Sequence, residues 1–182
     1  MFKEYTLKDN STIIIREGIL SDALALNELA MTTFSTAEHV LTTPNEFIPK
    51  STEEAQQLRI TEYTIQEGWV LLVAEHDGQL IGNIDFTNGR CVRNQHTGEF
   101  GMSVHPDYKN KGVGKHLLAA LLDWAKANPL IEKVKLRVFT NNKPAVHLYE
   151  KLGFIKEGEL HCEVKMETGM YIDLYEMYKM VK

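Results

Sequence analysis

The feature that most constrains the fold is a strand that ends in a basic loop and continues into a long helix. The strand closes at Val104, because Pro106 cannot donate a ladder hydrogen bond. Three lysines and two glycines follow, namely Lys109, Lys111, Gly112, Gly114 and Lys115. The first turn of a helix presents unpaired N–H groups at its partially positive end, and glycine lets a phosphate approach them. The stretch therefore predicts an anion site that suits a diphosphate.

Three better-known motifs do not fit this region. A nucleotide-binding P-loop needs glycine where Lys109 stands and serine or threonine where His116 stands. A dinucleotide fingerprint needs glycine at Leu117. The serine at Ser103 lacks the final glycine of a nucleophile elbow, because His105 is there. The alternative to a phosphate site is a simple turn with solvated lysines.

Composition predicts one soluble domain over residues 1–182, with 43% hydrophobic residues. The net charge of −5 disfavours non-specific nucleic-acid binding, which depends on neutralising phosphates. No apolar run approaches the roughly 18 residues of a membrane span, and the N-terminal residues do not read as a signal peptide. Cys91 and Cys162 form neither a CxxC pair nor a zinc pattern, so we expect a cytoplasmic protein without a metal.

Hydrophobic periodicity predicts strands that alternate with helices in a mixed order. The expected strands cover 12–16, 69–75, 80–86, 98–105, 134–138, a segment from 154 onward, and 171–180. Helices are expected from Ser21 or Asp22 to 33, from a Ser51–Glu54 capping box to 66, over 112–128, and over 142–152, with a loop or broken helix at 35–50. Asp77-Gly78 predicts a tight hairpin. The order favours an α/β fold with a mixed, largely antiparallel sheet flanked by helices and one parallel step near 100–138.

Two motifs together resemble the GNAT superfamily of acetyl-CoA-dependent N-acetyltransferases. Lys109-x-x-Gly112-x-Gly114 is similar to its (Gln/Arg)-x-x-Gly-x-(Gly/Ala) motif. Its second signature is matched by Asn142-x-x-Ala145-x-x-Leu148-Tyr149-x-x-Leu152-Gly153-Phe154. The resemblance covers roughly residues 98–156 and implies a twisted sheet whose parallel strands splay apart. Lys109 departs from the usual glutamine or arginine, so a planar side-chain fork is missing there.

The resemblance also implies how acetyl-CoA, the cosubstrate, would bind. The loop amides would hold its pyrophosphate, at residues Lys109, Asn110, Lys111, Gly112, Val113, Gly114 and Lys115. The pantetheine arm would follow the strand residues Met102, Ser103 and Val104, with the Val104 N–H facing the thioester oxygen. Asn142 and Ala145 would line the arm, and Tyr149 would lie near the sulfur.

Acetyl transfer by direct attack of an amine needs a base for the amine and an acid for the departing sulfur. Tyr149 is the candidate acid; the alternative is a core tyrosine on the apolar helix stripe. Glu99 is the leading candidate base, and Asp85 is second; the alternative for Glu99 is a solvated strand carboxylate.

The acceptor is open between a small-molecule amine and a protein N-terminus, and a homodimer is compatible with the resemblance. Two other functions are weighed against the enzyme. One is a CoA-binding regulatory module without catalysis, which the presence of Tyr149 disfavours. The other is nucleic-acid binding through the lysine patch, which the acidic net charge disfavours. We expect neither nucleic acid nor membrane as a partner.

Overall fold

Eight strands form a single sheet over residues 2–36 and 38–182, which are the residues that the computed structural model describes. The strands are β1 (Phe2–Thr6), β2 (Thr12–Glu17), β3 (Val70–His76), β4 (Gln79–Asn88), β5 (Thr97–Val104), β6 (Lys133–Phe139), β7 (Ile155–Lys165) and β8 (Tyr171–Met180). They lie in the order β1-β2-β3-β4-β5-β6-β8-β7. Neighbouring strands are antiparallel except for β5 and β6, which are parallel. The predicted fold class is thus confirmed.

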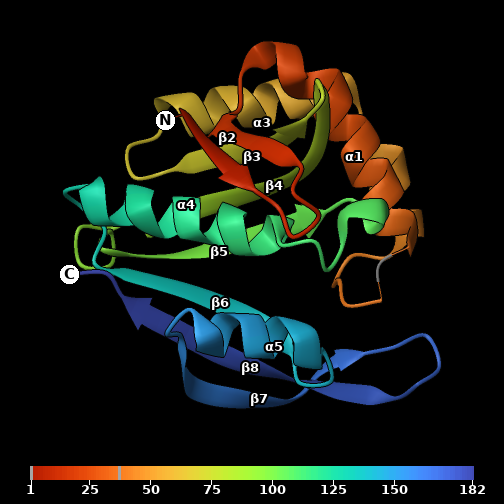
Figure 1. Ribbon diagram of the computed structural model, residues 1–182. Helices are drawn as coiled ribbons and strands as arrows, with labels where there is room; N and C mark the ends of the chain where they lie inside the picture. Colours follow the sequence, from red (N-terminus) through yellow and green to blue (C-terminus); the bar gives the residue numbers. More distant parts are fainter. Residues whose placement is uncertain (1, 37) are drawn as a thin grey trace.

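Helices cover both faces of the sheet (Figure 1). The longer helices are α1 (Ala23–Thr36), α3 (Glu53–Ile65), α4 (Val113–Ala127) and α5 (Lys143–Lys151); the short ones are α2 (Pro44–Phe47), η1 (Leu20–Asp22), η2 (Ile48–Lys50) and η3 (Pro106–Tyr108). In Figure 1, α4 and α5 lie in front of the sheet, and α1 and α3 lie on its other side. We call these the α4 face and the α3 face.

The largest hydrophobic core lies between the sheet and α4. Leu117, Leu118 and Leu121 of α4 are fully buried there. They pack in one cluster with Ile84 and Phe86 of β4. Burying a leucine side chain is worth about 1.5–3 kcal/mol, so this apolar stripe fixes α4 on the sheet. The N-terminal end of α4 is thereby held rigidly beside the end of β5.

Three local details differ from the sequence prediction. Strand β1 was not expected, because its polar, mostly exposed residues lack an apolar run and it is an edge strand. Helix α3 is capped by Thr52, whose side chain accepts the Ala55 N–H, and not by Ser51. Helix α1 does not begin at Ser21 or Asp22, because these residues belong to η1 and α1 follows η1 directly. The Asp22 carboxylate accepts the N–H of Ile19, the residue before η1, at 2.9 Å. The hairpin turn is as predicted, with Asp77 and Gly78 both at positive φ.

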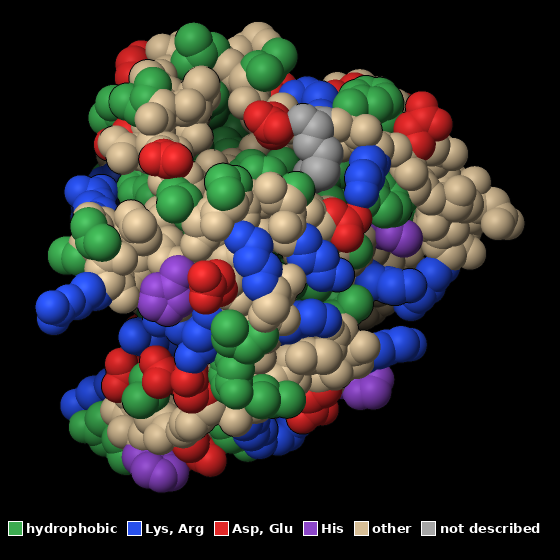
Figure 2. All heavy atoms as spheres, turned by 90° about the vertical axis from the view of Figure 1, so that its left-hand side faces the viewer, with side chains coloured by type: hydrophobic (Ala, Val, Ile, Leu, Met, Phe, Trp, Pro, Cys, Tyr) green, Lys and Arg blue, Asp and Glu red, His purple; other side chains and the backbone are tan. Residues whose placement is uncertain are grey.

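Positive charge is not confined to the basic loop. Figure 2 views the end of the molecule that lies on the left of Figure 1, near the C-terminus and away from the start of α4, and Lys and Arg side chains gather across its middle. Lysine density alone therefore does not single out a phosphate site on this molecule. Among the described residues, no helix has both the length and the apolar character needed to cross a membrane.

Candidate active site

The basic loop leaves the first amides of α4 without a cap. Gly112 is the N-cap residue, at φ 107°, and no side chain caps the helix. The first helical hydrogen bond runs from His116 N–H to Gly112 C=O, at 3.1 Å. The preceding N–H groups, of Val113, Gly114 and Lys115, have no acceptor within the helix. Helices α3 and α5, by contrast, are each capped by a side chain. The start of α4 is thus built to receive an outside acceptor.

A cleft of about 860 Å³ runs from this loop to the facing surface of α5. Ten of the residues predicted for donor binding line it, namely Met102, Val104, Lys109, Asn110, Gly112, Val113, Gly114, Lys115, Asn142 and Ala145. Gly114 lies close to the end of β5: a Cβ at this position would lie 3.3 Å from the Met102 Cε, a tight contact with the flexible end of that side chain. The basic loop and the start of α5, which the sequence indicated by two separate motifs, therefore line one cleft.

The floor of the cleft is a split in the sheet. β5 and β6 pair only where Thr97–Glu99 face Lys133–Lys135, although both strands continue. The N–H of His105 bonds Ile81 C=O on the β4 side, and His96 C=O accepts N–H groups from the β6 side. Because backbone groups alternate along a strand, those of Met102 and Val104 face the split beyond the last pair. This is an open ladder edge inside the sheet, which an extended ligand with amide groups can pair with.

Asn142 serves as the N-cap of α5. Its Oδ1 accepts the Ala145 N–H at 3.3 Å. The residue also lines the cleft. The cap uses the side-chain oxygen and leaves the amide nitrogen for another partner. Capping and ligand contact are therefore compatible in this residue.

Tyr149 belongs to α5, and its side chain points from the helix into the edge of the core. Only 8% of the residue is exposed, and its ring packs edge-on against Phe100 at 5.8 Å. Burial raises the pKa of its hydroxyl to about 12. No hydrogen-bond partner for this hydroxyl occurs among the residues that the structure describes. Tyr149 is thus a core residue, which was the alternative to a catalytic role, and it is also a protonated donor without a fixed acceptor.

The two candidate bases lie on the α3 face, on neighbouring strands. Asp85 is opposite Gly101 in the β4–β5 register. One of its oxygens accepts Arg59 at 2.9 Å and the other accepts the Tyr63 hydroxyl at 2.8 Å. Glu99 is more open, with a 43% exposed side chain and one ion pair to Arg137 at 3.6 Å. Of the two carboxylates, Glu99 is therefore the more exposed and the less tightly paired.

Four predicted site residues do not line the cleft, namely Glu99, Ser103, Lys111 and Tyr149. Ser103 lies on the opposite face of β5 from Met102 and Val104, because strand side chains alternate. The ammonium of Lys111 lies 4.9 Å from the centre of the Tyr108 ring and 3.5 Å from an Asp9 carboxylate oxygen. For Ser103 and Lys111, only the backbone remains available to a ligand in the cleft.

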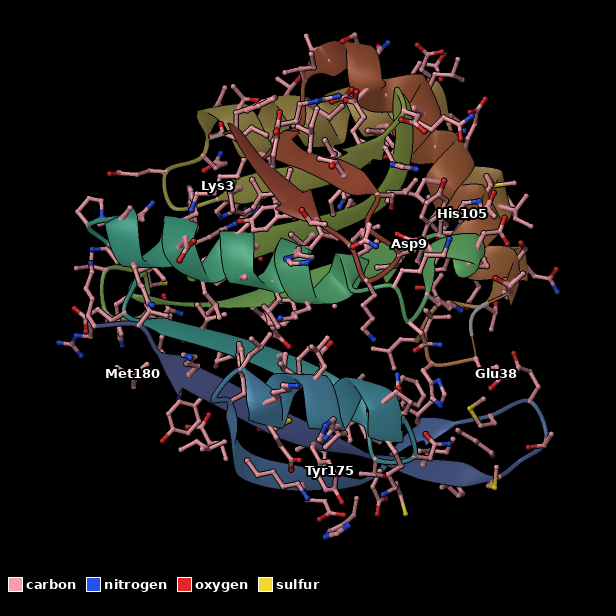
Figure 3. The ribbon with its side chains drawn as sticks, viewed as in Figure 1. Lys3, Asp9, Glu38, His105, Tyr175 and Met180 are labelled. Carbon is pink, nitrogen blue, oxygen red and sulfur yellow. The ribbon has the colours of Figure 1, made fainter. Side chains whose placement is uncertain are left out.

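The cleft has lining residues that the sequence did not indicate. Glu38 and His39 come from the segment after α1, and the His39 ring meets Phe139 of β6 edge-on at 5.6 Å. Lys8 comes from the turn between β1 and β2. The only sequence signal for that turn is Asp9-Asn10-Ser11, a cluster of turn-forming residues. Figure 3 shows Asp9 of this turn beside the start of α4, and Glu38 farther to the right and lower in the view.

A group that could hold a metal lies elsewhere. Glu159, His161 and Asp173 on β7 and β8 offer ligand atoms within 4.8 Å of one another. Asp173 already accepts the Cys162 N–H at 2.7 Å and contacts His161 at 3.3 Å. The group does not contribute to the cleft.

Known proteins resemble this chain in sequence and in fold. The model of the acetyltransferase (GNAT) family matches residues 32–154. An L-amino acid N-acetyltransferase of Escherichia coli, AaaT, is 28% identical over 71% of this chain and 78% of its own length. A spermidine N(1)-acetyltransferase of Vibrio cholerae is 31% identical over 59% of this chain and 60% of its own. A GNAT-family acetyltransferase structure from Streptococcus pneumoniae superimposes with a TM-score of 0.85 at 27% identity, over 93% of this chain and 99% of that one. A Salmonella typhimurium structure, described as a putative acetyltransferase with acetyl-CoA, gives 0.82 at 20% identity, over 93% and 94%.

Proposed function

The chain belongs to the acetyltransferase (GNAT) family, and we propose that it moves the acetyl group of acetyl-CoA to a primary amine of a small molecule. One observation carries the proposal: a single cleft joins the uncapped amides of α4 to the open backbone edge of β5. A diphosphate suits the first part, and an amide-containing arm suits the second. CoA carries both groups on one molecule, and the Salmonella relative was solved with acetyl-CoA.

The chemistry requires a neutral amine, a stabilised oxyanion and a stabilised leaving group. An alkyl amine has a pKa near 10.4 in water, so a base must take its proton. Glu99 supplies that base, directly or through water. The Val104 N–H, at the end of the open edge, donates to the developing oxyanion. The new bond forms between nitrogen and the acetyl carbon, the amine proton passes to Glu99, the bond from that carbon to sulfur breaks, and CoA leaves as a thiolate that takes a proton from water.

Tyr149 serves as the donor to the departing sulfur. Its pKa of about 12 keeps the hydroxyl protonated at neutral pH. A thiol has a pKa near 8.5, so this phenol is the weaker acid and shares its proton with sulfur through a hydrogen bond. Its role is to stabilise the thiolate as the bond breaks. No enzyme nucleophile is needed.

The amine acceptor is supported by the relatives and by the exposed carboxylate of Glu99 on the α3 face. The relatives in Escherichia coli and Vibrio cholerae are named for amino acids and for spermidine. Asp85 on that face is paired with Arg59, and Glu176 is paired with Arg137, whereas Glu99 has a longer ion pair and a 43% exposed side chain, so Glu99 is the carboxylate most open to an incoming ammonium group. We propose a small cationic or zwitterionic amine as the acceptor.

A thiol-release assay tests the proposal. The protein is mixed with acetyl-CoA and, separately, with L-amino acids, polyamines and a peptide with a free N-terminus. Release of CoA with an amino acid or a polyamine, together with the acetylated product by mass spectrometry, is the expected result. Release of CoA with the peptide alone would show that the acceptor is a peptide N-terminus and not a small amine. Binding of acetyl-CoA by calorimetry without release by any amine would indicate a CoA-binding module instead of an enzyme.

A further inference from the structure

The turn between β1 and β2 packs directly on the basic loop. The backbone N–H of Lys8 donates to Lys111 C=O at 3.1 Å. The Lys8 ammonium donates to Asn110 C=O at 2.8 Å. The Asp9 carboxylate meets the Lys111 ammonium at 3.5 Å, and Figure 3 shows Asp9 at this contact between the turn and α4. Three contacts thus join a turn near the N-terminus to a loop about a hundred residues later.

The turn itself is internally fixed. Asp9 accepts the Ser11 hydroxyl at 2.6 Å and the Ser11 N–H at 3.2 Å. These hydrogen bonds from Ser11, with a contribution from Lys111, lower the pKa of the Asp9 carboxyl. Leu7, just before the turn, is 3% exposed and belongs to the main core. Lys8 is therefore presented from a backbone that is anchored on both sides.

The sequence suggests that Lys111 faces the cleft, but in the structure the side chain of Lys8 lines it and that of Lys111 does not. Lys111 stands inside the phosphate motif, but its side chain lies against Tyr108 and Asp9. Lys8 stands outside the motif, and its side chain lines the cleft together with Lys109 and Lys115. An ammonium has three donors, and the bond to Asn110 uses one of them. Two donors of Lys8 remain for a ligand.

We propose that Lys8 is a phosphate-binding residue of the donor site, supplying from the N-terminal turn the charge that Lys111 directs elsewhere. The proposal rests on the proposed use of acetyl-CoA. CoA carries phosphate in two places, the diphosphate and the 3′-phosphate, and the ammonium suits either. The Asp9–Lys111 pair positions the turn, and Lys8 touches the ligand.

Affinity measurements with three ligands test the assignment. Lys8→Met and Lys8→Arg are compared with wild type by calorimetry, using CoA, 3′-dephospho-CoA and S-acetylpantetheine, which lacks phosphate. A hydrogen bond to a charged group corresponds to about a tenfold change in affinity or more. We expect Lys8→Met to weaken CoA binding at least tenfold, Lys8→Arg to restore most of it, and S-acetylpantetheine binding to be unchanged. A loss with dephospho-CoA as well assigns the contact to the diphosphate; a loss with CoA alone assigns it to the 3′-phosphate.

The matched control is Lys126→Met, which removes the same charge from the last turn of α4, outside the cleft. It should leave CoA affinity within twofold. The affinity lost in Lys8→Met should also shrink as salt is raised, because salt screens a phosphate contact. Equal CoA affinity in wild type and Lys8→Met overturns the assignment, as does an equal loss for S-acetylpantetheine, which would indicate loop support alone. Wild-type protein that does not bind CoA would instead overturn the proposed function itself.

Discussion

The Arg137 Nε on β6 lies 3.6 Å from a carboxylate oxygen of Glu99 on β5, at the point where the two strands cease to pair. The same guanidinium contacts Glu176 of β8 at 3.2 Å. One arginine therefore links three strands on the α3 face, at the base of the split. Glu99 is held at the split while much of its side chain stays open to solvent.

Replacing Glu99 tests the proposed base. We expect Glu99→Gln to lower kcat by about 10²–10⁴, the usual contribution of general base catalysis. The KM for acetyl-CoA should change little, because Glu99 does not line the donor cleft. The acid limb of the kcat/KM profile, which reports the essential base, should shift or vanish. Glu159→Gln, on an outer strand, is the control; an unchanged acid limb in Glu99→Gln would remove Glu99 from the mechanism.

Tyr149→Phe tests the donor to the sulfur. We expect kcat to fall by about 10²-fold or more, with stability nearly unchanged because the ring contacts to Phe100 and Phe154 remain. Since the pKa of Tyr149 is raised to about 12, wild-type kcat should show no decline from this hydroxyl between pH 6 and 9. Tyr178→Phe on β8 removes a hydroxyl outside the cleft and should keep full activity. Equal kcat in Tyr149→Phe and Tyr178→Phe would leave Tyr149 as a core residue only.

Gly112→Ala tests the uncapped helix start. A Cβ at a φ of 107° is strained, at a cost of about 1–2 kcal/mol, and relief of that strain would turn the α4 amides. We expect weaker acetyl-CoA binding by about tenfold, measured by calorimetry. Gly169→Ala is matched to it, since Gly169 has a φ of 84° with open space around it in the β7–β8 turn. That variant should lose similar stability while it binds acetyl-CoA normally; a parallel loss of affinity would point to general destabilisation.

The buried ion pair between Arg16 and Asp22 predicts a pH dependence of stability. Burial alone would raise the pKa of Asp22, but hydrogen bonds from Arg16 and the Ile19 N–H outweigh it, and the pKa is lowered. A lowered folded pKa stabilises the protein above the unfolded value near 3.9, and this stability is lost as pH falls through the folded pKa.

Asp22→Asn should therefore lower the free energy of unfolding by about 1–2 kcal/mol at pH 7, because Arg16 loses the charge-assisted hydrogen bonds to its closest partner and keeps only those to Glu75. Urea unfolding at pH 7, 5 and 3.5 measures this. The difference from wild type should narrow toward pH 3.5. A difference that stays constant over this range would mean that the ionised carboxylate contributes nothing.

Much of the architecture was predictable because it depends on local patterns. The apolar stripe of α4, the Asp77-Gly78 turn and the strands around it are fixed by residues within a few positions of one another. The uncapped start of α4 is equally local, since it needs only a glycine where serine or aspartate would cap. Strand β1 was missed because an exposed edge strand carries no such pattern.

Local sequence alone determined the basic loop that opens α4, the α5 motif and most of the alternation of strands and helices, because each depends on short-range backbone geometry and periodicity. Tertiary structure alone decided which lysine faces the cleft. Lys111 turns toward Asp9 and Tyr108, and Lys8 takes its place from a turn distant in sequence. It also decided that Arg137 meets Glu99 at the split. Such contacts arise only when the sheet order brings distant strands together, and no periodicity within one segment encodes them.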